Sequence, residues 1–98
     1  MNFNQRVYNL CKKIPKGRVS TYKLIATKLK TNAYRAVGNA LNKNPYAPVV
    51  PCHRVVNSDG RVGGFAKGTK AKIRMLEKER IKIKKNKIVD FKKILVRL

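Results

Sequence analysis

Acidic residues, histidine and cysteine are scarce in this chain of 98 residues. It holds four Asp and Glu, one histidine and two cysteines. A tetrahedral zinc site needs about four such ligands, so this set argues against a metal site, and we expect neither a metal nor another cofactor. No apolar run is long enough to span a bilayer, and none near the start is typical of a signal peptide. We therefore expect a cytoplasmic protein with free thiols and no membrane contact.

Positive charge, in contrast, is abundant. The 25 Lys and Arg residues give a formal net charge of +21, with twelve of them in residues 1–61 and thirteen in residues 67–98. This excess favours a polyanionic partner through long-range attraction and counterion release. Nucleic acid is the first candidate, and a coding or habitat bias toward lysine is the alternative.

Apolar spacing predicts three helices in the first half of a single small domain. The first covers residues 3–14 and stops at Pro15-Lys16-Gly17, with Cys11 on its apolar side as a core residue. Ser20 and Thr21 can cap a second helix, whose apolar residues are Leu24, Ile25, Ala26 and Leu29. After a break at residues 30–32, a third helix is expected over residues 33–42, with Val37, Ala40 and Leu41 facing inward.

The second and third helices form a helix-turn-helix candidate. The later helix is slim, because alanines and Gly38 give it little side-chain bulk. A slim helix can approach a sugar-phosphate wall or a narrow groove closely, and Arg35, Asn39 and Lys43 are available for polar contacts. The alternative from the pattern alone is an ordinary helical hairpin with tight packing.

Cys52 and His53 are neighbours in the stretch VPCHRVV. Residues 45–51 contain three prolines and predict an extended connector leading to this pair. In a strand the two side chains would point to opposite faces. In a short helical turn begun by Pro51, the cysteine would lie at a positive helix end that favours a thiolate, and the imidazole could act through a water. The dipeptide alone does not decide between these two geometries.

The second half of the chain predicts a mixed set of elements. We expect a turn at residues 57–60, a glycine-rich loop at 62–68 without a phosphate-binding motif, and a helix over 69–80. Residues 81–83 and 88–91 predict a hairpin, followed by a basic tail over 92–98. The fold class is therefore mainly α (α+β), a small winged helix-turn-helix-like domain and an expected monomer. Residues 1–80 would form its body and 81–98 a hairpin and tail of the same domain.

The run RAVGNALNKNP, followed by VPCHRVV, a GG pair and MLEKE, resembles the O6-alkylguanine-DNA alkyltransferases. The resemblance covers about residues 3–80 and concerns the DNA-binding, active-site domain of these suicide repair proteins. It implies a protein that flips an O6-alkylguanine out of duplex DNA and transfers the alkyl group, once and irreversibly, to its own cysteine.

The resemblance also implies four catalytic roles. Cys52 would accept the alkyl group, and His53 would take the cysteine's proton through a water. Glu79 would orient and charge the histidine, while Asn44 would hold the turn and the water network.

Further roles concern the base and the duplex. Arg35 would fill the gap left by the extruded nucleotide, and residues 33–43 would enter the minor groove as the recognition helix. The implied substrate contacts are Tyr22, Arg35, Val55, Phe65 and Ala66. The implied DNA contacts are Thr21, Ala33, Tyr34, Arg35, Ala36, Gly38, Asn39 and Lys43.

Some features depart from the family pattern. Phe65, Ala66 and Lys67 stand where the family commonly has tyrosine, serine and glycine, which bears on the range of alkyl groups accepted. The length, without the family's usual N-terminal domain, is similar to that of the non-catalytic alkyltransferase-like proteins, which bind the lesion and signal to other repair pathways. Cys52 favours the transferase, and a basic winged-helix architectural protein is a third hypothesis.

Overall fold

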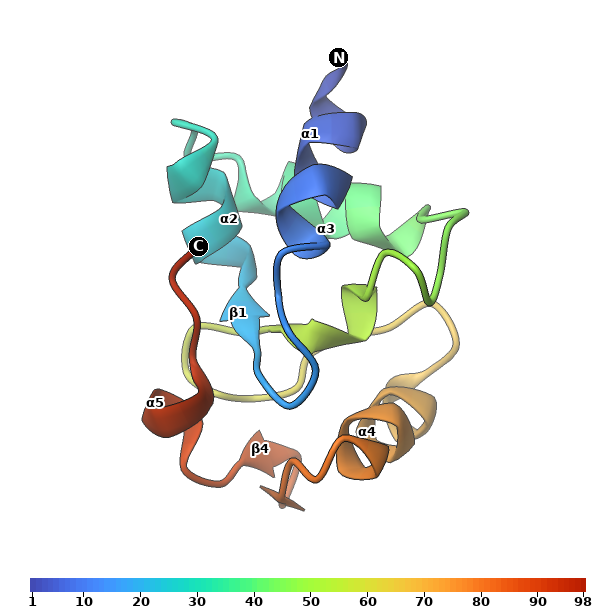
Figure 1. Cartoon of the computed structure of the whole chain (residues 1–98), viewed down its shortest axis with the longest axis vertical. Coiled ribbons are helices and arrows are strands. Elements are labelled where there is room, and N and C mark those ends of the chain that lie inside the picture. The colour runs from blue at the N-terminus through green and yellow to red at the C-terminus, as the bar shows by residue number, and fades with distance from the viewer.

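Two apolar cores lie at opposite ends of the molecule in the computed structural model, which describes all residues 1–98 (Figure 1). Three helices surround the first core, and a helix with a hairpin surrounds the second. Short strands connect the two ends. In chain order the elements are α1 (Phe3–Cys11), β1 (Ser20–Thr21), α2 (Tyr22–Lys28), α3 (Tyr34–Asn42), the 3₁₀ helix η1 (Cys52–Arg54), β2 (Val55–Val56), α4 (Thr69–Lys78), β3 (Ile83–Lys84), β4 (Lys87–Ile88) and α5 (Phe91–Ile94).

Helix α1 begins at a capping box. The Asn2 side chain accepts a hydrogen bond from the Gln5 amide at 2.8 Å, and the Gln5 side chain accepts one from the Asn2 amide at 3.1 Å. The helix ends at Cys11, three residues earlier than predicted, yet Ile14 is still buried. Cys11 is fully buried, which confirms its expected place in the core.

Helices α2 and α3 form the predicted pair. Thr21 caps α2 by accepting a hydrogen bond from the Leu24 amide at 3.0 Å. Three inward-facing side chains of α3, those of Val37, Ala40 and Leu41, are buried as expected. With α1 they enclose the first core, and the predicted fold class is confirmed.

The hairpin is shorter than predicted. Strands β3 and β4 pair Ile83 with Ile88 and Lys84 with Lys87, so only Lys85 and Asn86 form the turn. Both turn residues have a positive φ, of 52° and 62°. Two left-handed residues are typical of the tight turn whose twist matches that of antiparallel strands. Strand β4 ends at Ile88, so residues 89–91 of the predicted strand lie outside it.

The C-terminal residues are not a free tail. Residues 91–94 form α5, and the following segment pairs with Val19 next to β1. The Val19 amide donates to the Ile94 carbonyl at 3.0 Å, and the Val96 amide donates to the Val19 carbonyl at 2.7 Å. Apolar side chains at 94, 95, 96 and 98, spaced between basic residues, explain why this segment packs instead of extending into solvent.

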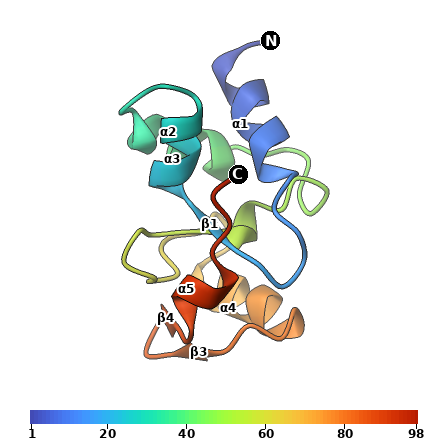
Figure 2. The same cartoon turned by 60° about the vertical axis from the view of Figure 1, so that its left-hand side comes forward.

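The hairpin does not lie beside the helix pair. Both views place β3 and β4 at the far end of the molecule from α2 and α3 (Figure 2). Ile81 and Ile88 anchor it to the second core. The predicted hairpin is therefore present but does not lie against the helix-turn-helix, because its apolar residues pack on α4 and α5.

The connector over residues 45–51 is coiled, where an extended segment was expected. The Val50 amide donates to the Tyr46 carbonyl at 3.0 Å, closing one turn of the chain. Asn44 stabilises this turn through its side chain, which donates to the Val50 carbonyl at 2.8 Å and accepts from the Tyr46 amide at 2.9 Å.

No helix of the fold has the length and apolar character needed to cross a membrane.

The glycine-rich loop offers a matched pair of substitutions. Gly63 has a φ of +75°, and a Cβ atom there would lie 2.9 Å from the Asn57 side-chain oxygen, whereas a Cβ on Gly64 would meet nothing within 4 Å. We expect Gly63→Ala to lower the free energy of unfolding by about 1–2 kcal/mol, seen as a lower Tm by calorimetry. Gly64→Ala should leave Tm nearly unchanged, and equal effects of the two would contradict this account of the loop.

Candidate active site

Cys52 begins the 3₁₀ turn η1, which decides between the two geometries left open by the sequence. Its amide donates to the Val50 carbonyl at 2.8 Å, and its side chain is only 9% exposed as part of the first core. The turn is preceded by Pro51 and by the Asn44-stabilised loop. The alternative of a strand running through residues 52 and 53 is thereby excluded.

His53 bonds to the carboxylate of Glu79. Its Nε2 atom lies 2.8 Å from Oε2 of Glu79, although the two residues are 26 positions apart. His53 is 4% exposed, so this contact is shielded from bulk water. A carboxylate on one ring nitrogen fixes the orientation of the imidazole and favours the tautomer with its other nitrogen free to accept.

Arg54 binds the same carboxylate with a fork of donors. Its Nη2 lies 2.8 Å from Oε2 and its Nε lies 3.0 Å from Oε1, while Nη1 donates to the Ile14 carbonyl at 2.9 Å. The Gly17 amide donates to Oε1 at 3.2 Å. Glu79 therefore joins η1, the loop after α1 and the end of α4.

These contacts set the charge state of Glu79. Burial raises the pKa of this carboxyl, but hydrogen bonds from Arg54, His53 and the Gly17 amide outweigh burial and lower the pKa to about 2. Glu79 is thus an anion throughout the physiological range. It can stabilise a positive charge on His53.

A second charged group, Lys72 of α4, contacts β2. It is fully buried, and its Nζ donates to the Val55 carbonyl at 2.7 Å, the Gly64 carbonyl at 3.1 Å and the Tyr22 hydroxyl at 3.3 Å. The ammonium group also lies 5.6 Å from the centre of the Tyr22 ring. One side chain of α4 thus connects α2, β2 and the glycine-rich loop.

Burial changes the acid-base properties of this second cluster. It lowers the pKa of Lys72 to about 8, against an opposing attraction from a negative charge on Cys52. It raises the pKa of Tyr22 to about 12, and negative charge on Cys52 adds to that effect. Tyr22 therefore keeps its proton and remains a hydrogen-bond donor, and the thiol lies within electrostatic reach of both groups.

Two surface hollows adjoin Tyr22 and His53, and Cys52 lines neither of them. One, of about 450 Å³, is lined by Tyr22 and Lys23 of α2, Tyr34 of α3 and the turn at residues 57–59. The other, of about 460 Å³, is lined by His53, Glu79 and basic neighbours. Tyr22 and His53 thus line separate hollows.

A known family matches most of this chain. The profile of the 6-O-methylguanine DNA methyltransferase, DNA binding domain, matches residues 2–81. The chain belongs to this methyltransferase DNA-binding domain family.

Two curated relatives of this chain are named methylated-DNA--protein-cysteine methyltransferase. A methylated-DNA--protein-cysteine methyltransferase of Sulfolobus acidocaldarius is 48% identical over 82 residues, 84% of this chain and 52% of the relative. One of Methanosarcina barkeri is 46% identical over 79 residues, 80% of this chain and 50% of the relative. The chain therefore spans about half the length of the curated relatives it matches.

Two solved structures are similar to this chain over different shares of their length. Mycobacterium tuberculosis OGT in complex with DNA superposes with a TM-score of 0.78 at 40% identity, covering 82% of this chain and 50% of that one. S. pombe Atl1 in complex with damaged DNA containing O6-carboxymethylguanine superposes with a TM-score of 0.84 at 28% identity, covering 96% of this chain and 94% of that one. The Atl1 superposition extends over more of this methyltransferase-family chain.

The structure brings the predicted catalytic residues into one region. Cys52 and His53 share η1, Glu79 contacts His53, and Asn44 stabilises the loop that leads to them. The carbonyl of Val55, implied as a substrate contact, already accepts from Lys72, and Phe65 packs against the first core while Ala66 is exposed.

The predicted DNA contacts lie mostly on the open side of α3. Ala33, Tyr34, Arg35, Asn39 and Lys43 are exposed and Ala36 is half-buried. Gly38 faces the Tyr22 ring, with 4.0 Å between that ring and an added Cβ. Thr21 is 2% exposed and caps α2. Their contact with DNA stays a prediction.

Sequence reasoning missed Lys72 and Arg54. Lys72 is one of 25 basic residues, and nothing in its neighbours marks it as buried. A usable signal exists in the spacing, because positions 72, 76 and 79 recur on one face of a helix that carries Leu76 inward. Arg54 directly follows the predicted His53, and this position next to the site was the available signal.

The low pKa of Glu79 predicts an acid-dependent loss of stability. Folding holds this carboxylate ionised, so its contribution is present above its ordinary pKa of about 4.3 and is lost as pH falls toward about 2. In Glu79→Gln we expect a free energy of unfolding lower by about 1–3 kcal/mol at pH 7, and a smaller difference from wild type below pH 4. Urea denaturation across this pH range measures both quantities.

Glu77→Gln is the matched control, because Glu77 lies on the same helix, is exposed and forms no ion pair. It should follow the wild-type curve. A Glu79→Gln difference that stays constant down to pH 2 would contradict the ionised, bonded state described for this carboxylate.

Proposed function

We propose that this protein repairs DNA by transferring the alkyl group of an O6-alkylguanine to Cys52, once per molecule. The observation that carries the proposal is the hydrogen-bonded cluster of His53, Glu79 and Arg54 directly after Cys52 in a chain of this methyltransferase family. A thiolate attacks a saturated carbon well, and the arrangement supplies a base with a fixed anion behind it.

The first step is activation of the thiol. With Nε2 of His53 bonded to Glu79, the other ring nitrogen accepts the Cys52 proton through a bound water. The histidinium that forms faces the Glu79 anion and is stabilised by it. The hollow next to His53 and Glu79 gives this proton a path to solvent.

The second step is the transfer. The Cys52 sulfur forms a bond to the alkyl carbon while the bond from that carbon to guanine O6 breaks, and the bonding electron pair stays on the guanine. The guanine anion then gains one proton, replacing the one lost by the thiol. The Tyr22 hydroxyl, held by Lys72 and kept protonated, donates a hydrogen bond to the leaving base.

The thioether product ends the reaction. The thiolate of an alkylated cysteine is a poor leaving group near neutral pH. Water therefore does not displace it from the alkyl carbon, and the free cysteine is not regenerated. Each molecule therefore acts as reagent and enzyme together.

The base must leave the duplex to reach Cys52, which is buried. Flipping is cheapest for a base that pairs poorly, as O6-alkylation makes guanine do. The exposed side of α3, with Arg35 and Asn39, faces the minor groove in this proposal, and Arg35 fills the space left in the stack. Duplex DNA carrying O6-alkylguanine is then both partner and substrate.

A non-catalytic lesion-binding role is the second candidate. It is favoured by the superposition on S. pombe Atl1, which spans nearly the full length of both chains. In this role the protein would hold alkylated guanine for other repair proteins. A lesion-binding role does not require a cysteine next to a histidine that is bonded to a carboxylate. We therefore place transfer first.

The central test is the intact mass of the protein after incubation with a duplex containing one O6-methylguanine. We expect a gain of one CH₂ equivalent per molecule, located at Cys52 and absent in Cys52→Ala. Cys11→Ala is the matched control, because burial raises the pKa of Cys11 to about 12 and makes it a poor nucleophile.

Cys11→Ala should gain the methyl group like the wild type. No mass gain in the wild type, with selective binding of the damaged duplex, would favour the lesion-binding role. A gain retained in Cys52→Ala would overturn the assignment of the acceptor.

Lys72→Met tests the positioning of Tyr22. The substitution keeps an unbranched side chain, shorter by its terminal ammonium, and leaves the Val55 and Gly64 carbonyls without their donor. We expect single-turnover transfer to slow by about 10- to 100-fold. Affinity for undamaged duplex should not change, because Lys72 has no exposed surface.

The pH dependence separates this role from a purely structural one. The pKa of Lys72 is about 8, so its ammonium is lost as pH rises through that value. The rate advantage of wild type over Lys72→Met should therefore shrink above pH 8. A wild-type rate in Lys72→Met would contradict the role.

A further inference from the structure

The C-terminal segment is held firmly beside α2, although it lies outside the matched family domain at residues 2–81. Val19 exchanges two backbone hydrogen bonds with Ile94 and Val96, and the Ser20 hydroxyl donates to the Val96 carbonyl at 2.8 Å. Leu98 packs against the first core. These contacts fix the position of Arg97 between two anchored neighbours.

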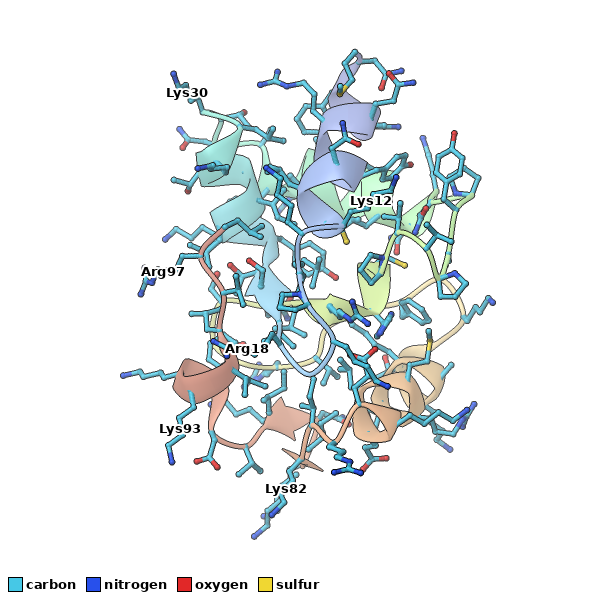
Figure 3. All side chains as sticks on the ribbon, viewed as in Figure 1. Lys12, Arg18, Lys30, Lys82, Lys93 and Arg97 are labelled. Atoms are coloured by element: carbon cyan, nitrogen blue, oxygen red, sulfur yellow. The ribbon has the colours of Figure 1, made fainter.

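Arg97 lies at a hollow on the α2 side of the molecule. The hollow, of about 260 Å³, is lined by Arg97, by Thr21, Lys23 and Thr27 of the α2 segment, and by Ser58. Figure 3 shows the Arg97 side chain pointing outward on this side. The lining therefore combines two cations with hydroxyl groups, the donor set that binds phosphate oxygens.

This hollow continues into the one next to Tyr22. Lys23 and Ser58 line both of them, and the larger hollow extends to Tyr34 at the start of α3. A track of donors thus runs from the predicted recognition helix, past the tyrosine expected at the flipped base, to the C-terminal segment.

The charges along this track are free to bind an anion. Lys23 and Arg97 are exposed and take part in none of the three ion pairs of the protein. The acidic residue in the track, Asp59, lies 3.6 Å from Arg61 and is compensated by it.

We propose that Arg97, together with Lys23, forms a phosphate contact that extends the DNA interface beyond the family domain. This inference rests on the proposed function, because the ligand of the contact is the same duplex that α3 is proposed to bind. The C-terminal segment thereby holds one strand of the DNA backbone next to the extruded nucleotide. It contributes affinity without sequence or lesion preference, because phosphates carry neither.

Salt dependence is the measurement that counts such contacts. Each neutralised phosphate adds about 0.9 to the slope of log affinity against log salt concentration. For Arg97→Ala we expect a slope shallower by about 0.9 and an affinity about fivefold lower at about 0.15 M salt, equally for duplexes with and without O6-methylguanine. Fluorescence anisotropy titrations at four salt concentrations give both values.

Two further variants keep the test decisive. Lys82→Ala removes the same charge near the hairpin, away from α2 and α3 (Figure 3), and should retain the wild-type slope. Arg97→Lys keeps the charge and should restore the slope. Equal losses of slope and affinity in Lys82→Ala and Arg97→Ala would show an effect of net charge alone and overturn the proposal. An unchanged slope in Arg97→Ala, with an unchanged Tm, would overturn it as well.

The mass gain at Cys52, measured on the same samples, reports the proposed transfer independently. Arg97→Ala should still accept one methyl group when the duplex is saturating. An unchanged slope with normal transfer refutes this inference alone, whereas no transfer in the wild type refutes the proposed function and leaves the phosphate contact measurable.

Discussion

The carboxylate of Glu79 is the contact on which the arrangement of the site depends. It receives hydrogen bonds from His53, from Arg54 and from the Gly17 amide, and these partners belong to different segments. In a chain of net charge +21 with four acidic residues, one partly buried carboxylate that accepts hydrogen bonds from several donors is a strong local attraction. It orients the histidine and at the same time attaches the end of α4 to the loop after α1.

Lys72 supplies the complementary constraint from the same helix. Residues 72 and 79 are two helical turns apart, so α4 directs a cation and an anion toward the strand and turn that carry Cys52. The cation fixes the Val55 and Gly64 carbonyls and the Tyr22 hydroxyl, and the anion fixes the imidazole of His53. Cys52 directly precedes the histidine that the anion holds, and its charge acts on the cation.

Much of the fold follows from local sequence signals. Apolar spacing and caps gave α1, α2, α3 and α4 within a few residues, because a helix is built from contacts three and four positions apart. The resemblance to a repair family pointed to Cys52, His53 and Glu79, and the structure brings these residues together. The 3₁₀ geometry at Cys52 was not predictable, since proline and neighbouring valines fit a strand equally well.

Long-range contacts explain why Lys72, the C-terminal segment and the position of the hairpin were not predicted from the sequence. Lys72 looks like any surface lysine until the carbonyls it binds, 8 and 17 residues away, are placed around it. The C-terminal segment looks like a basic tail until Val19, 76 residues earlier, offers it a pairing edge. The hairpin's position depends on the second core, which no local pattern describes.

The separation of the two cores has a consequence for the order of folding. The helices of the first core contact one another over short stretches of chain, whereas Glu79 reaches Gly17 across 62 residues and Ser20 reaches Val96 across 76. Contacts that close long loops form slowly, because the entropy of closure is lost before the contact gains anything. The helical end can therefore assemble early, while the bonded histidine forms only when the chain's two halves have met. The contact between His53 and Glu79 therefore forms in the last stage of folding, so a half-folded chain carries Cys52 without the oriented histidine that is proposed to activate it.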